Sequence, residues 1–251
     1  MIYVLFLTFI LAILYLAFYQ WQFFLIFSPT YYRDGELGCE FEKLSIFTPD
    51  NTELEGVIYT PKKHTTTLLY FGGRSQDSVG FIKKLAQCFP TKQIVTFNYR
   101  GYGKSKGSLT EKNIMEDGLH VAQKVQKNYG DFYIVGFSLG SSVASYVASK
   151  HKAKGVFLVG VYDSVANIAK KKFGINLSLL LRYKFDNTKV VKNIEIPTYV
   201  FVSKTDKTTY IENARELKKH YKNLTFYKEL DNLTHKELMC DKYVIKKIDE
   251  F

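Results

Sequence analysis

The sequence is poor in cysteine and proline, with three cysteines and five prolines in 251 residues. Cys39, Cys88 and Cys240 cannot all pair with one another, and their spacing fits no metal-ligand motif, so a cysteine-based metal site is excluded. Cys88 and Cys240 lie in apolar stretches of helical pattern, which predicts buried thiols and favours a reducing compartment. The chain also lacks low-complexity tracts and internal repeats, which excludes a repeat architecture.

Long runs of positive charge are absent as well. The formal net charge is +11, yet no run of Lys or Arg is longer than three residues. No nucleic-acid-binding motif is present, and we therefore expect no nucleic-acid partner. Lysines spread along the chain are typical of a solvated surface, and attraction to an anionic membrane surface is the alternative interpretation.

Charge is missing altogether from residues 2–27, where three uncharged polar residues interrupt an apolar run. A helix needs about 20 apolar residues to cross the hydrocarbon layer of a membrane. A basic leading region and a small-residue cleavage site are not evident, so we expect residues 1–28 to form an uncleaved transmembrane anchor. Arg33 and Lys43 are the positive charges that follow it, and the positive-inside rule then favours a cytoplasmic domain.

After this anchor, the hydrophobic pattern predicts strands and helices in alternation. Residues 41–48 and 54–60 are typical of an antiparallel hairpin. Apolar runs of strand length follow at 67–71, 93–99, 131–137, 155–162, 197–203 and 224–230. Apolar residues recur at helical spacing in 79–89, 113–129, 139–151, 210–221 and 236–251.

This alternation indicates the α/β class, with a mainly parallel, doubly wound sheet covered by helices on both faces. We expect residues 40–251 to form one domain, with a short lid-like insertion at 164–193. In such sheets, reactive groups gather beyond the carboxyl ends of the strands. Candidate site residues are therefore sought at the corners between a strand and the next helix.

One such corner has the sequence "IVGFSLGSSVA" at residues 134–144, in which Ser138 stands between Gly136 and Gly140. The glycines remove Cβ atoms that would collide in a sharp turn between a strand and a helix. Such a turn would hold the Ser138 hydroxyl above the sheet. The pattern therefore fits both a tight turn and a catalytic nucleophile.

A serine hydroxyl needs a base and an orienting acid to act as a nucleophile. His235 lies in the loop between the last predicted strand and the last predicted helix, where it could reach Ser138. Asp206 follows the strand at 197–203 and is our choice for the acid. Asp163 follows the preceding strand and is the alternative. The order Ser138, Asp206, His235 along the chain is the order found in α/β-hydrolases.

An acyl-transfer site also needs two N–H donors for the oxyanion. The Leu139 N–H, directly after Ser138, is one candidate. The Arg74 N–H, in the loop after the strand at 67–71, is our choice for the other, with Ser75 as the neighbouring option. The Arg74 side chain could instead meet a polar or anionic part of a substrate. Gly72-Gly73 lets this loop turn closely, and we expect both glycines and Ser75 to contact the substrate.

These residues carry a resemblance. The segments "YFGGRSQD", "FNYRGYGKSKG" and "GFSLGSS", with the Asp206 and His235 loops, resemble the α/β-hydrolase superfamily over residues 40–251. They are most similar to its small serine hydrolases with one N-terminal membrane helix. The resemblance implies a structural role for Arg100, Gly101 and Gly103. Three departures from the family pattern bear on substrate shape: Gly72-Gly73 in place of His-Gly, Ser203 in place of Gly, and Ser141 in place of a second Gly.

The expected activity is hydrolysis of ester or thioester bonds in a small-molecule or lipid acyl substrate, through an acyl-enzyme on Ser138. Amide or peptide hydrolysis by the same residues is an alternative, and a membrane-tethered scaffold without activity is another. The sequence has no His/Asp cluster with metal-ligand spacing, so we expect neither a metal nor a cofactor.

Overall fold

The computed structural model describes residues 1–33, 35–64 and 66–251. Eight strands form one sheet in this part of the chain. They are β1 (Phe41–Phe47), β2 (Glu53–Tyr59), β3 (Thr67–Phe71), β4 (Gln93–Phe97), β5 (Phe132–Phe137), β6 (Gly155–Val159), β7 (Thr198–Ser203) and β8 (Leu224–Leu230). The helices are α1 (Ile2–Ile26), α2 (Ser78–Cys88), α3 (Glu111–Tyr129), α4 (Leu139–Ala148), α5 (Val165–Phe173), α6 (Thr188–Val191), α7 (Ile211–Lys218), the 3₁₀ helix η1 (Leu238–Cys240) and α8 (Lys242–Asp249).

The sheet has the strand order β1-β2-β4-β3-β5-β6-β7-β8. Strand β2 pairs antiparallel with β1 and β4, whereas all pairs from β4 to β8 are parallel. The predicted hairpin and the mainly parallel sheet are thus confirmed. Since β3, β5, β6 and β7 run in one direction, the loops after them lie at the same edge of the sheet.

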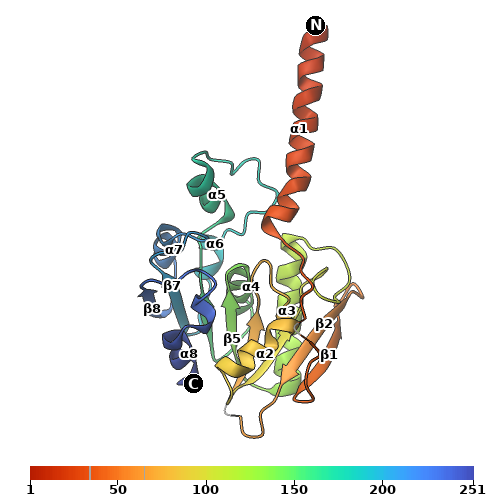
Figure 1. Ribbon diagram of the computed structural model, residues 1–251. Helices are drawn as coiled ribbons and strands as arrows, with labels where there is room; N and C mark the ends of the chain where they lie inside the picture. Colours follow the sequence, from red (N-terminus) through yellow and green to blue (C-terminus); the bar gives the residue numbers. More distant parts are fainter. Residues whose placement is uncertain (34, 65) are drawn as a thin grey trace.

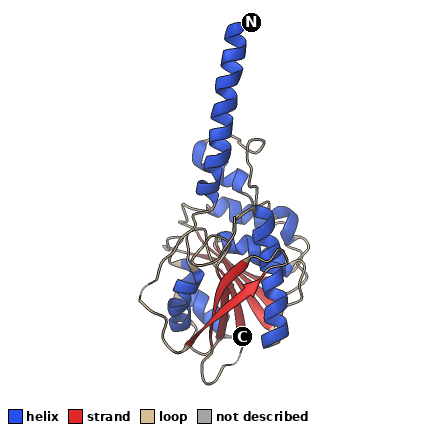
Figure 2. Cartoon of the chain, turned by 90° about the vertical axis from the view of Figure 1, so that its right-hand side faces the viewer, coloured by secondary structure: helices blue, strands red, loops and turns tan. Residues whose placement is uncertain are grey.

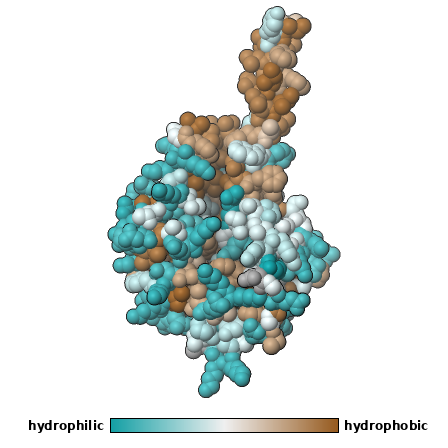
Figure 3. All heavy atoms as spheres, viewed as in Figure 1, coloured by the Kyte–Doolittle hydropathy of each residue, from teal (hydrophilic) through white to brown (hydrophobic). Residues whose placement is uncertain are grey.

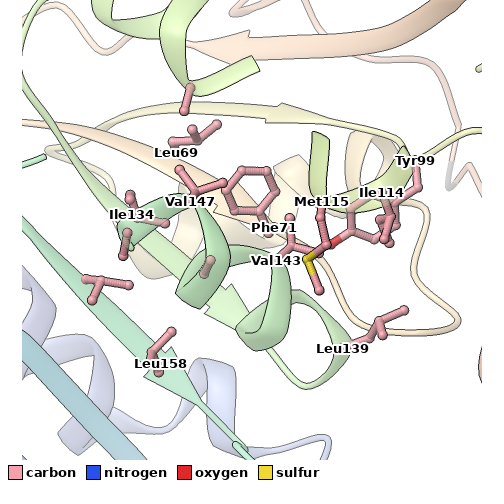
Figure 4. Packing of buried hydrophobic residues seen from close by; sticks show 14 of the residues in the cluster. Leu69, Phe71, Tyr99, Ile114, Met115, Ile134, Leu139, Val143, Val147 and Leu158 are labelled. Carbon is pink, nitrogen blue, oxygen red and sulfur yellow. The ribbon is translucent and has the colours of Figure 1, made fainter. Parts of the chain in front are cut away.

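Helices cover both faces of the sheet (Figure 2). Successive side chains of a strand point to opposite faces, so β3 supplies both hydrophobic cores. Leu69 and Phe71 pack on the α3–α4 side with Val143, as Figure 4 shows. Leu68 and Tyr70 belong to the second core, on the α2–α8 side. Burial on both faces explains why these strands are apolar at every position rather than at alternate ones.

Helix α1 extends away from the sheet and ends beside α5 (Figure 1). Its surface is almost entirely apolar (Figure 3), with a mean hydropathy of 2.5 over its most apolar window. Within the described part of the chain, it is the one helix that has the length and composition of a membrane span. A signal sequence near an N-terminus has the same length and composition.

The C-terminal turns of α1 are packed against the rest of the chain. Gln22 is buried, its Nε2 donates to the Leu180 carbonyl, and its Oε1 accepts the Arg182 N–H. Phe27 is fully buried, and its ring packs edge-on against that of Tyr183 at 4.7 Å between centroids. These contacts fix the end of α1 next to the segment 174–187.

Two predictions from the sequence need correction. The apolar pattern of 236–251 is divided between η1 and α8, because Asp241 caps α8 by accepting the N–H groups of Tyr243 and Val244. Cys88 and Cys240 are free and half-buried rather than buried. The expected insertion at 164–193 contains α5 and α6, and α5 lies next to α1 (Figure 1).

Candidate active site

Ser138 occupies the sharp turn between β5 and α4, with φ +54° and ψ −119°. Positive φ is unfavourable for a residue with a Cβ atom, so the surrounding packing must hold this conformation. A Cβ at Gly136 would overlap the Cβ of Ala144, and one at Gly140 would overlap the Phe71 carbonyl. The two glycines therefore permit the turn, as the sequence predicts.

His235 lies between Ser138 and Asp206. Its Nε2 is 2.8 Å from Ser138 Oγ, and its Nδ1 is 2.6 Å from Asp206 Oδ2. Asp206 Oδ1 accepts the N–H groups of Thr208 and Thr209, and Oδ2 accepts the Thr209 hydroxyl. Burial acts to raise the pKa of Asp206, but the hydrogen bond and charge of His235 and these further donors hold it below its ordinary value.

The alternative acid, Asp163, has other partners. Its Oδ1 accepts the Ser164 N–H, and its Oδ2 accepts the Asn167 side-chain amide. Burial raises the pKa of Asp163, against the effect of these donors. His235 Nδ1 is bonded to Asp206, and the geometry therefore favours Asp206 as the group that orients the histidine.

The loop after β3 approaches the Ser138 turn, since a Cβ at Gly73 would lie 3.5 Å from Ser138 Cβ. Two tyrosines of the "NYRGYG" segment hold this loop. Tyr99 donates its hydroxyl to the Gly72 carbonyl at 2.8 Å, and Tyr102 donates to the Arg74 carbonyl. The hydrogen bond from Tyr102 thus fixes the position of the Arg74 carbonyl.

The oxyanion pair expected from the sequence consists of the Leu139 and Arg74 N–H groups. Leu139 is the first residue of α4, and N–H groups in the first turn of a helix have no intrahelical acceptor. Both residues line a cavity of about 280 Å³ next to Ser138. Their assignment as oxyanion donors stays a prediction.

Gly72, Gly73 and Ser75 are not among the described residues that line this cavity. The Gly72 carbonyl accepts from Tyr99, and the Gly73 N–H donates to Gln76 Oε1 at 3.1 Å. Both backbone groups are therefore engaged within the protein, and Ser75 is exposed. The geometry gives both glycines a role in shaping the loop, and substrate contact by Gly72, Gly73 and Ser75 stays a prediction.

Two departures from the family pattern make contacts inside the site. Ser203, fully buried at the end of β7, donates its hydroxyl to the Leu233 carbonyl in the His235 loop at 2.5 Å. Ser141 donates its hydroxyl to the Ser138 carbonyl at 2.6 Å. The Ser203 hydroxyl thus ties β7 to the His235 loop, a contact that glycine could not make. The Ser141 hydroxyl reinforces the bond that the Ser141 N–H already donates to the Ser138 carbonyl at 2.8 Å.

Gly160 is a residue that sequence reasoning missed. It follows β6 with φ +66°, and a Cβ placed there would lie 2.9 Å from His235 Cε1. The His235 ring cannot move aside easily, because both of its nitrogens are bonded and it packs on the Phe137 ring at 5.0 Å. A glycine after an apolar strand was visible in the sequence, but nothing there linked it to a histidine 75 positions later.

With His235 as the base that the sequence predicts, we expect Gly160→Ala to lower kcat for ester hydrolysis about 100-fold, because displacing a catalytic group by about 1 Å has an effect of that size. An alanine at position 160 must also adopt the left-handed backbone of Gly160, which should reduce the free energy of unfolding by about 1–2 kcal/mol. The control is Gly130→Ala, which has φ +76° but no described atom within 4 Å of the added Cβ. Steady-state kinetics and thermal unfolding test both variants. Equal losses of kcat in the two would show that backbone strain alone, and not displacement of His235, causes the effect.

The residues that line the cavity next to Ser138 include three with positive charge, namely Arg74, Lys172 and Lys207. Leu25 and Ile26 of α1 also line it, so the end of α1 lies at the candidate site. Within the described residues, no group of three or more His, Cys, Asp or Glu side chains is placed to hold a metal ion.

Residues 66–174 match the family model described as the alpha/beta hydrolase fold. A membrane protein of Saccharomyces cerevisiae, YNL320W, is 27% identical over 140 residues, which are 52% of this chain and 49% of that protein. The lysophosphatidylserine lipase ABHD12 of Macaca fascicularis is 27% identical over 145 residues, 49% of this chain and 36% of that protein. Each match thus covers less than half of the relative's length.

Solved structures resemble the fold over a longer part of the chain. An esterase of Pyrococcus furiosus superposes with a TM-score of 0.69 at 16% identity, over 88% of this chain and 96% of that one. A membrane phospholipase A, described as a bacterial virulence factor, gives a TM-score of 0.61 at 14% identity, over 84% and 85%. The sheet, the family match and these superpositions agree, and the chain is an α/β-hydrolase fold protein, distantly related to the yeast membrane protein YNL320W and to ABHD12.

Proposed function

We propose that this protein is a serine hydrolase that is held at a membrane by α1 and cleaves ester or thioester bonds of lipid-type acyl substrates. The observation that carries the proposal is the bridge of His235 between Ser138 Oγ, at 2.8 Å, and Asp206 Oδ2, at 2.6 Å. These distances lie in the range that proton transfer and orientation of the base require. A lipase, an esterase and a phospholipase among the similar proteins support ester substrates.

In the proposed reaction, Ser138 Oγ attacks the acyl carbonyl while His235 Nε2 accepts the hydroxyl proton. Asp206 fixes the histidine with its proton on Nδ1 and stabilises the positive charge that forms on the ring. The Leu139 and Arg74 N–H groups stabilise the oxyanion of the tetrahedral intermediate. His235 then donates the proton to the leaving oxygen or sulfur, and water releases the acid from the acyl-enzyme by the same steps.

Labelling by a fluorophosphonate probe tests this proposal directly, because the probe reacts with an activated serine and needs no knowledge of the substrate. The full chain in detergent micelles should be labelled and should hydrolyse p-nitrophenyl esters. Prior incubation with a p-nitrophenyl ester should slow the labelling, since both compete for the same serine. A folded chain that is neither labelled nor active on esters would show the proposal to be wrong.

The cytoplasmic placement of the domain stays a prediction, to be tested by a reporter fused after Phe251.

A further inference from the structure

A second and larger cavity lies along the side of α1. Its volume is about 540 Å³, within the range of about 300–1,000 Å³ that is usual for small-molecule sites. Helix α1 forms one wall, and α5 with the segment that follows it forms the other. Figure 1 shows these two elements side by side at the base of α1. We call this space the α1–α5 cavity.

The α1–α5 cavity adjoins the cavity next to Ser138. Five residues line both: Leu25, Ile26, Val165, Ile168 and Lys172. The α1–α5 cavity is therefore the neighbouring space for the rest of a molecule whose carbonyl lies at Ser138.

The walls of the α1–α5 cavity are suited to a hydrocarbon chain. Gln22 and Lys172 are the polar residues among those that line it. The Gln22 amide already bonds the Leu180 carbonyl and the Arg182 N–H, so it does not require a polar ligand. The other lining residues are apolar and include Trp21 and Leu177. Transfer of hydrocarbon from water to such a surface is favourable.

The wall formed by α1 is fixed to the hydrolase domain. Besides the Gln22 contacts, Arg74 Nη2 donates to the Phe24 carbonyl at 2.9 Å, and the Ser28 N–H donates to the Tyr102 hydroxyl at 3.0 Å. Arg74 thus joins the end of α1 to the loop that carries the proposed oxyanion donor. A cavity with fixed walls can discriminate between ligands by length, because filling it requires little reorganisation.

The outer side of this region is also apolar. Beside α1, four large hydrophobic residues are more than two-fifths exposed: Phe173, Ile175, Leu179 and Leu180. Figure 3 shows that hydrophobic surface extends from α1 onto the neighbouring part of the molecule. An exposed apolar surface of this kind marks contact with a membrane or another apolar partner. With α1 anchored as proposed, the α1–α5 cavity therefore lies beside the apolar surface that would face the bilayer.

We propose that the α1–α5 cavity binds the hydrocarbon chain of the acyl substrate, so that the last turns of α1 are part of the substrate site and select chain length. This inference rests on the proposed function, because it places the carbonyl end of the chain at Ser138. Helix α1 then has a second role besides anchoring. A domain that lacked residues 1–28 would lose one wall of the α1–α5 cavity, together with Leu25 and Ile26 of the cavity next to Ser138.

The test compares p-nitrophenyl acetate with p-nitrophenyl decanoate, using full-length protein in detergent micelles. Leu177→Trp fills the α1–α5 cavity at a position that does not line the cavity next to Ser138. It should lower kcat/KM for the decanoate at least about tenfold, since each methylene transferred from water contributes about fourfold to binding. The value for the acetate should not change. The matched control is Leu179→Trp, because Leu179 is 96% exposed and should tolerate the substitution with both esters.

A second pair of variants tests the wall formed by α1 without filling the cavity. Trp21→Ala should lower kcat/KM for the decanoate several-fold and leave the acetate unchanged. Phe24→Ala is its control on the same helix, since Phe24 is 65% exposed and lines neither cavity. Circular dichroism establishes that each variant is folded.

The outcomes separate the two proposals. Equal effects on both esters in Leu177→Trp and in Trp21→Ala, or no effect on either ester, would overturn the acyl-chain site while leaving the serine hydrolase intact. A wild-type protein that hydrolyses neither ester and is not labelled by a fluorophosphonate would overturn the proposed function itself, and the acyl-chain site with it.

Discussion

Ser138→Ala should lower kcat for p-nitrophenyl esters about 10⁶-fold and abolish fluorophosphonate labelling. Removal of the nucleophile from a Ser-His-Asp triad has an effect of this order, because the remaining groups act only as a unit. The residual rate would come from the oxyanion donors and substrate binding alone. Steady-state kinetics with the purified full chain and gel-based detection of the probe measure both effects.

The folding of this variant should be unaffected. Ser138 adopts φ +54° with a Cβ atom, and alanine keeps that atom, so the backbone strain of the turn is the same in both proteins. The Oγ of Ser138 is bonded to His235 near the surface, not to a buried core group, which limits the loss of stability.

Ser149→Ala is the matched control for the Ser138 variant. It removes a hydroxyl at the other end of α4, where Ser149 Oγ bonds the Tyr146 carbonyl within the same helix. Labelling and kcat should be those of the wild type. If Ser138→Ala kept a tenth or more of the wild-type kcat, Ser138 would not be the nucleophile, whatever its geometry.

The fold could be predicted from the sequence because apolar residues recur at a regular spacing in each strand and helix. β3 and β5 are apolar at nearly every position and are buried on both faces of the sheet, while α3 shows apolar residues at helical spacing on one face only. The relative placement of Ser138, Asp206 and His235 followed from a topological rule, since parallel strands bring their following loops to one edge. No long-range contact had to be known for that inference.

What the sequence could not provide were the contacts between segments. The need for glycine at position 160 depends on where the His235 ring lies, and the Gly72 and Gly73 backbone groups are occupied by Tyr99 and Gln76. The apolar run of residues 2–27 indicated a membrane helix, but hydropathy alone could not show that its last turns line a cavity. Such details depend on side-chain packing, which periodicity does not encode.

Asp206→Asn should lower kcat about 10⁴-fold while leaving the site nearly unchanged in shape. An asparagine in place of the triad acid favours the wrong tautomer of the histidine, in which Nε2 carries the proton and cannot accept one from Ser138. His235 Nδ1 lies 2.6 Å from Asp206 Oδ2, so the side-chain amide of an asparagine at position 206 would contact Nδ1 directly. Asp163→Asn is the control, because it removes a carboxylate at the same sheet edge whose partners are Ser164 and Asn167.

The pH dependence of stability gives an independent test of the same pair. Because the folded protein lowers the pKa of Asp206, its carboxylate contributes stability above the ordinary Asp pKa of about 4, and this contribution is lost as the pH falls through the lowered value. The difference in unfolding free energy between wild type and Asp206→Asn should therefore be largest near neutral pH and shrink in acid. Asp163 has a raised pKa, so the charge of its carboxylate opposes folding at neutral pH, and Asp163→Asn should show the opposite trend. Urea unfolding at neutral and acid pH measures both differences. If Asp163→Asn instead of Asp206→Asn lost the ester hydrolysis, the triad acid would be Asp163, and His235 would have to turn toward it during the reaction.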